Sequence, residues 1–273
     1  MGEEERTKWV GLFFCSHLNH GDHWGRIVNR QDTLEYEIDG NALVILGLFN
    51  LYRYKRKEPD VVAYILATYK KIKKWISKLL DESPFKGLLP CESELSGNPY
   101  TPNYQVFAIF PNYAMKVVLE AIVFVAKEEK DNEIYILAKK LSNEISKGIN
   151  RYLVSDGIKS NAPRGVWING IDGRDGTAYD FSDWVKTSWP VSHWTRQLPF
   201  IILPDFFSYN LKSSINRAAD LNSYEYIKKE MAKHPYFRKY GFISNTCWSG
   251  TGGRQMIQCL DMDKLSSLRL LFY

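Results

Sequence analysis

Helix-forming segments that follow one another in pairs limit this chain to a small set of folds. Apolar residues recur with the ~3.6-residue period of an α-helix over residues 39–57, 59–81, 104–127 and 131–153. The members of each pair are joined by a short connection, and a longer segment rich in glycine, proline and polar residues follows each pair. This order predicts helical hairpins in series, with a long loop at the same end of each hairpin.

The ends of these segments carry the residues that begin helices. Asp39 is a candidate N-cap, and Pro59 occupies a position where the first turn of a helix tolerates proline. The third segment is predicted to run from Tyr104 to Lys127 with a kink at Pro111, because proline interrupts the hydrogen bonding of a helix interior.

The rest of the chain is less regular. Residues 154–188 contain too much glycine and aspartate for a helix, and short strands fit there. Helical patterns return over residues 189–207 and 210–233. Strand-like alternation is scarce, so the fold class is predicted to be all-α, with residues 1–273 forming a single domain. No repeat of fixed period is visible, which disfavours an open solenoid.

Composition narrows the class of partner and the compartment. The net charge is +5, and the lysines of residues 69–78 interleave with apolar residues at helical spacing, which is typical of a solvated helix face and not of a nucleic-acid surface. No run of about 18 apolar residues predicts a membrane span, and the acidic start lacks the basic region of a signal peptide. Scattered cysteines favour reduced thiols and a cytoplasmic location; they are Cys15, Cys91, Cys247 and Cys259.

Histidines and aromatic residues suggest a polar ligand. His17, His20 and His23 lie in a glycine- and asparagine-containing stretch without an acidic or cysteine cluster, so neither a metal nor a cofactor is predicted there. A polar loop at the mouth of a cavity is the preferred interpretation. Aromatic residues make up 14% of the chain, and many lie near glycine, asparagine, aspartate and proline, which favours a recognition surface.

Four stretches in this order carry a family resemblance: IDGNALVILGLFNLY, WISKLL, GLLPCESELSG and PYTPNYQVFAIFPNYAMKVV. Over residues 24–156 the chain resembles the six-hairpin glycosidases, most closely the glucoamylase-type glycoside hydrolases. The resemblance implies an (α/α)6 toroid, formed in part or completely by these helical hairpins. It also implies hydrolysis of glucoside-type oligosaccharides with inversion, in which one carboxylic acid protonates the leaving oxygen and a second carboxylate activates water.

The resemblance also implies roles for particular residues. The general acid falls on Glu94, with Glu92 as the alternative, although the family's tryptophan and adjacent pair of glutamates are replaced here by ESELS. Trp24 lies in a WGR stretch like the one that stacks on sugar in the family, and Trp24 and Asp39 are assigned to substrate binding. The water-activating base is left open among four aspartates: Asp172, Asp175, Asp180 and Asp183.

A dense cluster of aromatic and polar residues occurs in DWVKTSWPVSHWTRQ. Indole rings pack against the CH faces of sugars, while histidine and arginine bind hydroxyl groups. The candidate substrate-binding residues here are Trp189, His193, Trp194 and Arg196. The alternative interpretation is that Trp189 and Trp194 pack between helices.

The chain is short for a complete toroid, since it begins at what resembles the second hairpin of the family. The expectation is a truncated or split member, a ring completed by a second chain, or an open ring whose apolar flank favours self-association. Two functions from other classes stay open. One is a non-catalytic carbohydrate-binding remnant of such an enzyme, and the other is a helical scaffold for protein partners.

Overall fold

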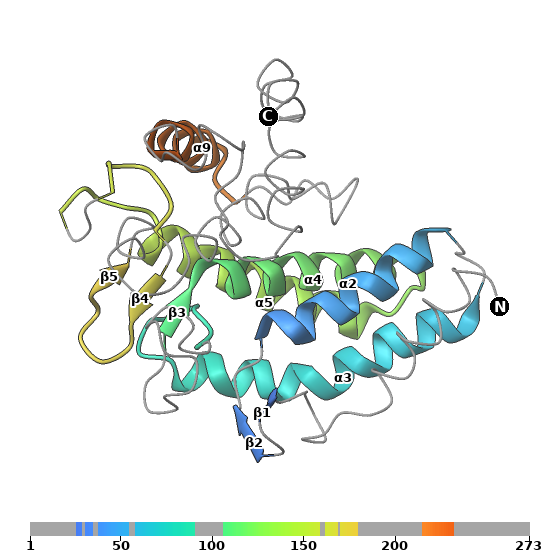
Figure 1. Ribbon diagram of the computed structural model, residues 1–273. Helices are drawn as coiled ribbons and strands as arrows, with labels where there is room; N and C mark the ends of the chain where they lie inside the picture. The colour runs from blue at the N-terminus through green and yellow to red at the C-terminus, as the bar shows by residue number, and fades with distance from the viewer. Residues whose placement is uncertain are drawn as a thin grey trace. The chain divides into compact units, whose positions relative to one another are not determined.

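A computed structural model describes residues 26–28, 31–34, 38–54, 58–90, 106–158, 162–168, 170–179 and 215–231. These residues are mostly helical, which confirms the predicted helical class (Figure 1). They form two compact units. The first contains α2, α3 and most of α4 and α5, and the second contains the strands β3, β4 and β5 together with α9.

The four helices of the first unit match the predicted pairs. They are α2 (Ile38–Tyr54), α3 (Pro59–Glu82), α4 (Ile109–Glu128) and α5 (Asn132–Tyr152). Pro59 is the first residue of α3, as predicted. Asp131 caps α5, because its Oδ1 accepts a hydrogen bond from the backbone N–H of Ile134 (3.0 Å). A hairpin of β1 (Arg26–Val28) and β2 (Gln31–Leu34) precedes α2 and was not predicted.

Burial alternates along the series of helices. The described side chains of α2 and α4 are buried around most of the helix circumference, whereas α3 and α5 each bury one stripe and expose the opposite face. The α3 stripe includes Ile65, Ile72 and Ile76, and the α5 stripe includes Ile134 and Ile145. A helix that is apolar all round needs neighbours on every side, so α2 and α4 are inner helices, whereas α3 and α5 are outer ones.

The inner helices run parallel to each other. Near their C-terminal ends the rings of Phe49 and Phe124 lie 5.9 Å apart, edge to face, and Tyr52 Oη donates to Glu129 Oε1 at 3.4 Å. The outer helices are also parallel, because Lys73 approaches Glu133 and, further along both segments, Gly87 meets Gly148. Each hairpin therefore repeats the same inner-then-outer order in the same direction (Figure 1).

Two predicted helix starts are wrong. Residues 106–108 form strand β3 and α4 begins at Ile109, so Pro111 lies in the first turn, where its missing N–H costs no intrahelical bond and no kink is required. The apolar run VFAIF is compatible with a strand as well as a helix, and pairing with β4 decides between them. α2 begins at Ile38, so Asp39 lies inside its first turn and is not the cap.

The second unit contains a small antiparallel sheet in the order β3–β4–β5. β3 (Val106–Ala108) pairs with β4 (Gly170–Asp172), which pairs with β5 (Ala178–Tyr179). These strands confirm that short strands occur within residues 154–188. Helix α9 (Arg217–Met231) begins at a cap, where the side-chain oxygen of Asn216 accepts from the N–H of Ala219 (3.1 Å).

Polar bonds fix α9 to the preceding loop of the same unit. Trp167 is fully buried, and its indole Nε1–H donates to Asp220 Oδ1 (2.9 Å), while its backbone N–H donates to the Ser223 hydroxyl (2.7 Å). The Asn222 amide also donates to the carbonyl of Gly165 (3.2 Å). These contacts place two buried polar groups of α9 opposite the Trp167 segment.

Removing the Asp220 carboxylate is expected to destabilise this unit. Asp220→Ala leaves the buried indole N–H without its acceptor, so the free energy of unfolding falls by about 2 kcal/mol. Asp220→Asn keeps an oxygen acceptor and loses less. Chemical denaturation of both variants measures the difference, and equal losses in the two would contradict this role for the Trp167–Asp220 bond.

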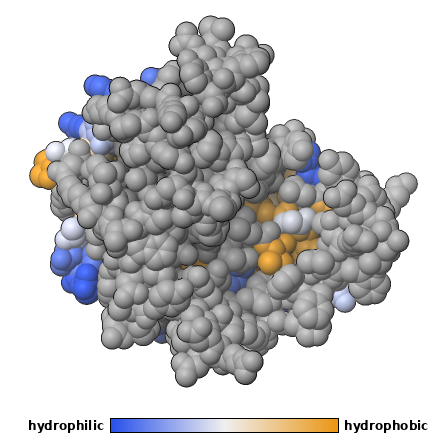
Figure 2. Space-filling view, viewed as in Figure 1, coloured by the Kyte–Doolittle hydropathy of each residue, from blue (hydrophilic) through white to orange (hydrophobic). Residues whose placement is uncertain are grey.

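Helix α4 is long and apolar enough to cross a membrane by length and composition, but 83% of that stretch is buried inside the protein. The core helix of a soluble protein meets the same criteria, so this is weak support for a membrane span. Figure 2 shows apolar side chains grouped over the position of α2, with hydrophilic ones toward the edges. Among the described residues, the strongly exposed large hydrophobics lie on separate elements: Ile136, Ile158 and Leu221.

Candidate active site

The segment that precedes the predicted acid in the chain lies in the first unit, at the end where α4 begins. The segment after α3 turns at Gly87, which has a positive φ of 88°, and continues through Leu88 to Pro90 with every residue buried. Glu92 and Glu94 follow Pro90 directly in the chain, outside the described residues. We call residues 87–90 the loop root.

Asn112 in the first turn of α4 binds the loop root through both halves of its side-chain amide. Its Oδ1 accepts from the backbone N–H of Leu89 (2.7 Å), and its Nδ2–H donates to the carbonyl oxygen of the same residue (3.0 Å). Asn112 and Leu89 are both fully buried. The amide therefore pairs with one peptide residue as a neighbouring strand would, and fixes both its position and its rotation.

A close contact between two glycines holds the loop root against α5. A Cβ built on Gly148 would overlap the carbonyl group of Gly87, and a Cβ on Gly87 would lie 2.5 Å from the carbonyl oxygen of Glu144. Only hydrogen at both positions permits this approach. Asn112 and the glycine pair thus hold the loop root from two different helices.

The inner helices carry further buried polar groups. Asn41 lies in the first turn of α2, as Asn112 does in α4, and both are fully buried. Lys116 is 4% exposed and forms an ion pair with Glu120 at 2.7 Å. Burial raises the pKa of Glu120, and the charge of Lys116 together with its hydrogen bond opposes that rise. Oε1 of Glu120 is thus paired within α4, whereas its Oε2 is buried without a hydrogen-bond partner among the described residues.

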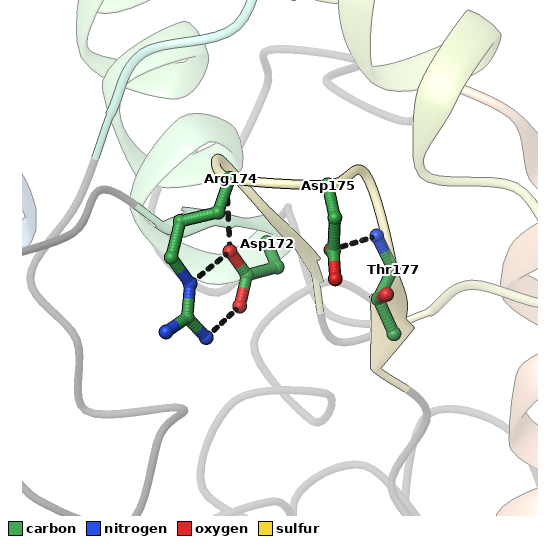
Figure 3. Close-up of polar contacts among 4 residues, drawn as sticks. All are labelled: Asp172, Arg174, Asp175 and Thr177. Atoms are coloured by element: carbon green, nitrogen blue, oxygen red, sulfur yellow. Dashed lines mark hydrogen bonds and ion pairs between the residues drawn. The ribbon is translucent and has the colours of Figure 1, made fainter.

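Two of the four candidate base aspartates lie at the β4–β5 connection: Asp172 is the last residue of β4, and Asp175 lies in the turn that follows (Figure 3). Asp172 is 1% exposed, and both of its oxygens accept from Arg174: Oδ1 from the backbone N–H (2.8 Å) and Nε (3.0 Å), and Oδ2 from Nη2 (2.6 Å). Asp175 is exposed and accepts from the backbone N–H of Thr177 (2.8 Å). Both side chains therefore stabilise this turn.

The other predicted site residues lie outside the part of the chain that the structure describes. For Asp39 the backbone is described, in the first turn of α2, but the side chain is not. The remainder are Trp24, Glu92, Glu94, Asp180, Asp183, Trp189, His193, Trp194 and Arg196, together with His17, His20 and His23. Within the described ranges, no group of three or more His, Cys, Asp or Glu side chains could hold a metal ion.

Sequence reasoning missed the residues that hold the loop root. Asn112 had one visible signal, because it is a polar residue within the apolar run IFPNYAM. Gly148 had another, since it falls on the buried stripe of α5. Neither signal identifies a partner, because the contacts join residues that are 23 positions apart or more in the chain.

The sequence matches no known protein-family model, and no curated protein matches it significantly.

Proposed function

We propose that this protein is a glycoside hydrolase that cleaves glucoside-type oligosaccharides with inversion, on an (α/α)6 toroid built in part or completely from its helical hairpins. Glu94, or Glu92 in its place, protonates the leaving oxygen, and a second carboxylate activates water. The aromatic residues Trp24, Trp189 and Trp194 stack on the sugar, and His193 and Arg196 bind its hydroxyl groups. No cofactor takes part.

The observation that carries this proposal is the repeated order of a buried helix followed by a half-exposed one. A toroid of this kind needs inner helices packed on all sides and outer helices exposed on one face, and α2 to α5 have that alternation. The inner helices are parallel, as in successive hairpins of a ring. The loop root lies at the end where α4 begins, and Glu92 and Glu94 follow it in the chain.

The chemistry needs a neutral acid and an ionised base separated by about 6.5–9.5 Å, so that water fits between the base and the sugar. Asp172 and Asp175 stabilise the β4–β5 turn, and we therefore favour Asp180 or Asp183 as the base. The resemblance in GLLPCESELSG and the dense aromatic cluster at residues 184–196 support a carbohydrate as the substrate.

Product stereochemistry tests the proposal directly. We expect the purified protein to release glucose from maltotriose or from a nitrophenyl glucoside, with proton NMR showing the inverted anomer first. A protein that releases no sugar but is stabilised against heat by oligosaccharides is a binding module, and the hydrolase proposal then fails. A protein that oligosaccharides neither stabilise nor react with is better explained as a helical scaffold.

A further inference from the structure

We propose that Asn112 is the positioning residue for the proposed catalytic loop, and that it acts through the backbone of Leu89. This inference rests on the proposed function and deepens it, because it identifies which part of the inner helix α4 determines where the acid lies. Asn112 itself contacts the loop root.

Asn112 holds the backbone on both sides of Leu89. A single hydrogen bond would hold the backbone at Leu89 on one side only, whereas the two bonds of Asn112, at 2.7 and 3.0 Å, engage the peptide N–H before the Leu89 Cα and the carbonyl after it. Both partners are fully buried, so water cannot replace either bond. A buried peptide group without partners is costly, which makes this pair the preferred state of the loop root.

The helix that carries Asn112 is tightly packed. Asn112 lies in the first turn of α4, within a run from Ile109 to Leu119 in which every residue is buried. On its other side the loop root meets the backbone of α5 at Gly148. The loop root is thus held by two packed helices, and Glu92 comes only three positions after Leu89 in the chain.

Proton transfer to a leaving oxygen is sensitive to small displacements of the acid. A general acid must lie within hydrogen-bond reach of the leaving oxygen, and a displacement of about 1 Å can lower the rate by about 100-fold. Loss of the Leu89 bonds should therefore lower kcat and leave KM nearly unchanged, because the residues proposed to bind the sugar belong to other segments.

The test uses Asn112→Leu, which keeps the approximate shape of the side chain and removes both hydrogen bonds. We expect kcat to fall about 100-fold, with little change in KM. Hydrogen exchange of the Leu89 amide should become faster in the same variant. Val125→Ala is the matched control, since it removes buried volume from the same helix at a position about 20 Å along the axis, and it should alter neither quantity.

A second variant keeps the inference testable if Asn112→Leu does not fold. In Asn112→Asp the introduced carboxyl reproduces the donor and the acceptor only when it is protonated, and burial favours that neutral form. The kcat of Asn112→Asp relative to wild type should therefore rise as the pH is lowered from 7 to 5. A purely structural defect would give a ratio that does not depend on pH.

The outcomes separate this inference from the proposed function. If the wild type hydrolyses glycosides and Asn112→Leu does so with the same kcat, the positioning role is overturned and the hydrolase proposal stands. If the wild type hydrolyses none, the hydrolase proposal is overturned. Hydrogen exchange then still decides the anchoring contact, and unchanged exchange at Leu89 in Asn112→Leu rejects it as well.

Discussion

Glu94→Gln is expected to lower kcat on oligosaccharides by about 10²–10⁴-fold, because an amide cannot deliver the proton that the departing sugar oxygen needs. The substitution keeps the size of the side chain, so the melting temperature should not change. An aryl glucoside with an acidic leaving group, such as a dinitrophenyl glucoside, leaves without much protonation. The loss on that substrate should be much smaller, and the contrast between the two substrates identifies the residue as the acid.

Glu92→Gln is the matched control for this experiment, because it makes the same chemical change two positions earlier in the same stretch. A small effect there supports Glu94. If the two results are exchanged, Glu92 is the acid and the proposed mechanism is otherwise unchanged. Full activity of both variants on oligosaccharides would show that neither glutamate donates the proton.

The helices of the first unit were predictable because their burial follows a period that the sequence displays. Ile65, Ile72 and Ile76 of α3 and Ile134 and Ile145 of α5 lie on the helical period of their segments, and all are buried. Such amphipathic helices need no knowledge of their partners, since the pattern of one segment reports which face is covered. Pro59 and Asp131 fixed the beginnings of two of these helices for the same local reason.

The start of α4 was not predictable from local pattern. VFAIF is apolar throughout, so it has no period that distinguishes a strand from a helix, and the decision comes from pairing between Phe107 and Ile171. The loop root has the same difficulty. Leu89 depends on Asn112 and Gly87 depends on Gly148, and only folding brings these residues together.

For the candidate site, the sequence identified residue types but not their roles. Asp172 and Asp175 were candidates for the water-activating base because they are carboxylates in a long polar loop. In the structure the Asp172 carboxylate accepts from Arg174, and the Asp175 carboxylate accepts from the backbone N–H of Thr177. An aspartate followed two residues later by a hydrogen-bond donor is typical of turns, and this local signal favours a structural role. The assignments of Glu92, Glu94 and the aromatic cluster stay predictions.

Gly148→Ala is expected to destabilise the first unit by about 3 kcal/mol, although alanine is ordinarily the better residue in a helix. The added methyl group would overlap the carbonyl of Gly87, which is backbone and cannot rotate away as a side chain would. This overlap is relieved only if the loop root moves away from α5. That movement strains the two hydrogen bonds between Leu89 and Asn112.

Gly47→Ala in α2 is the matched control, because the same substitution there meets no atom within 4 Å and the position is exposed. We expect it to stabilise the protein by about 0.5–1 kcal/mol, through the lower backbone entropy of the unfolded chain. Chemical denaturation of the two variants should thus give shifts of opposite sign. Stabilisation by Gly148→Ala would mean that α5 and the loop root do not approach as closely as described, and the anchoring of the proposed catalytic loop would lose its second support.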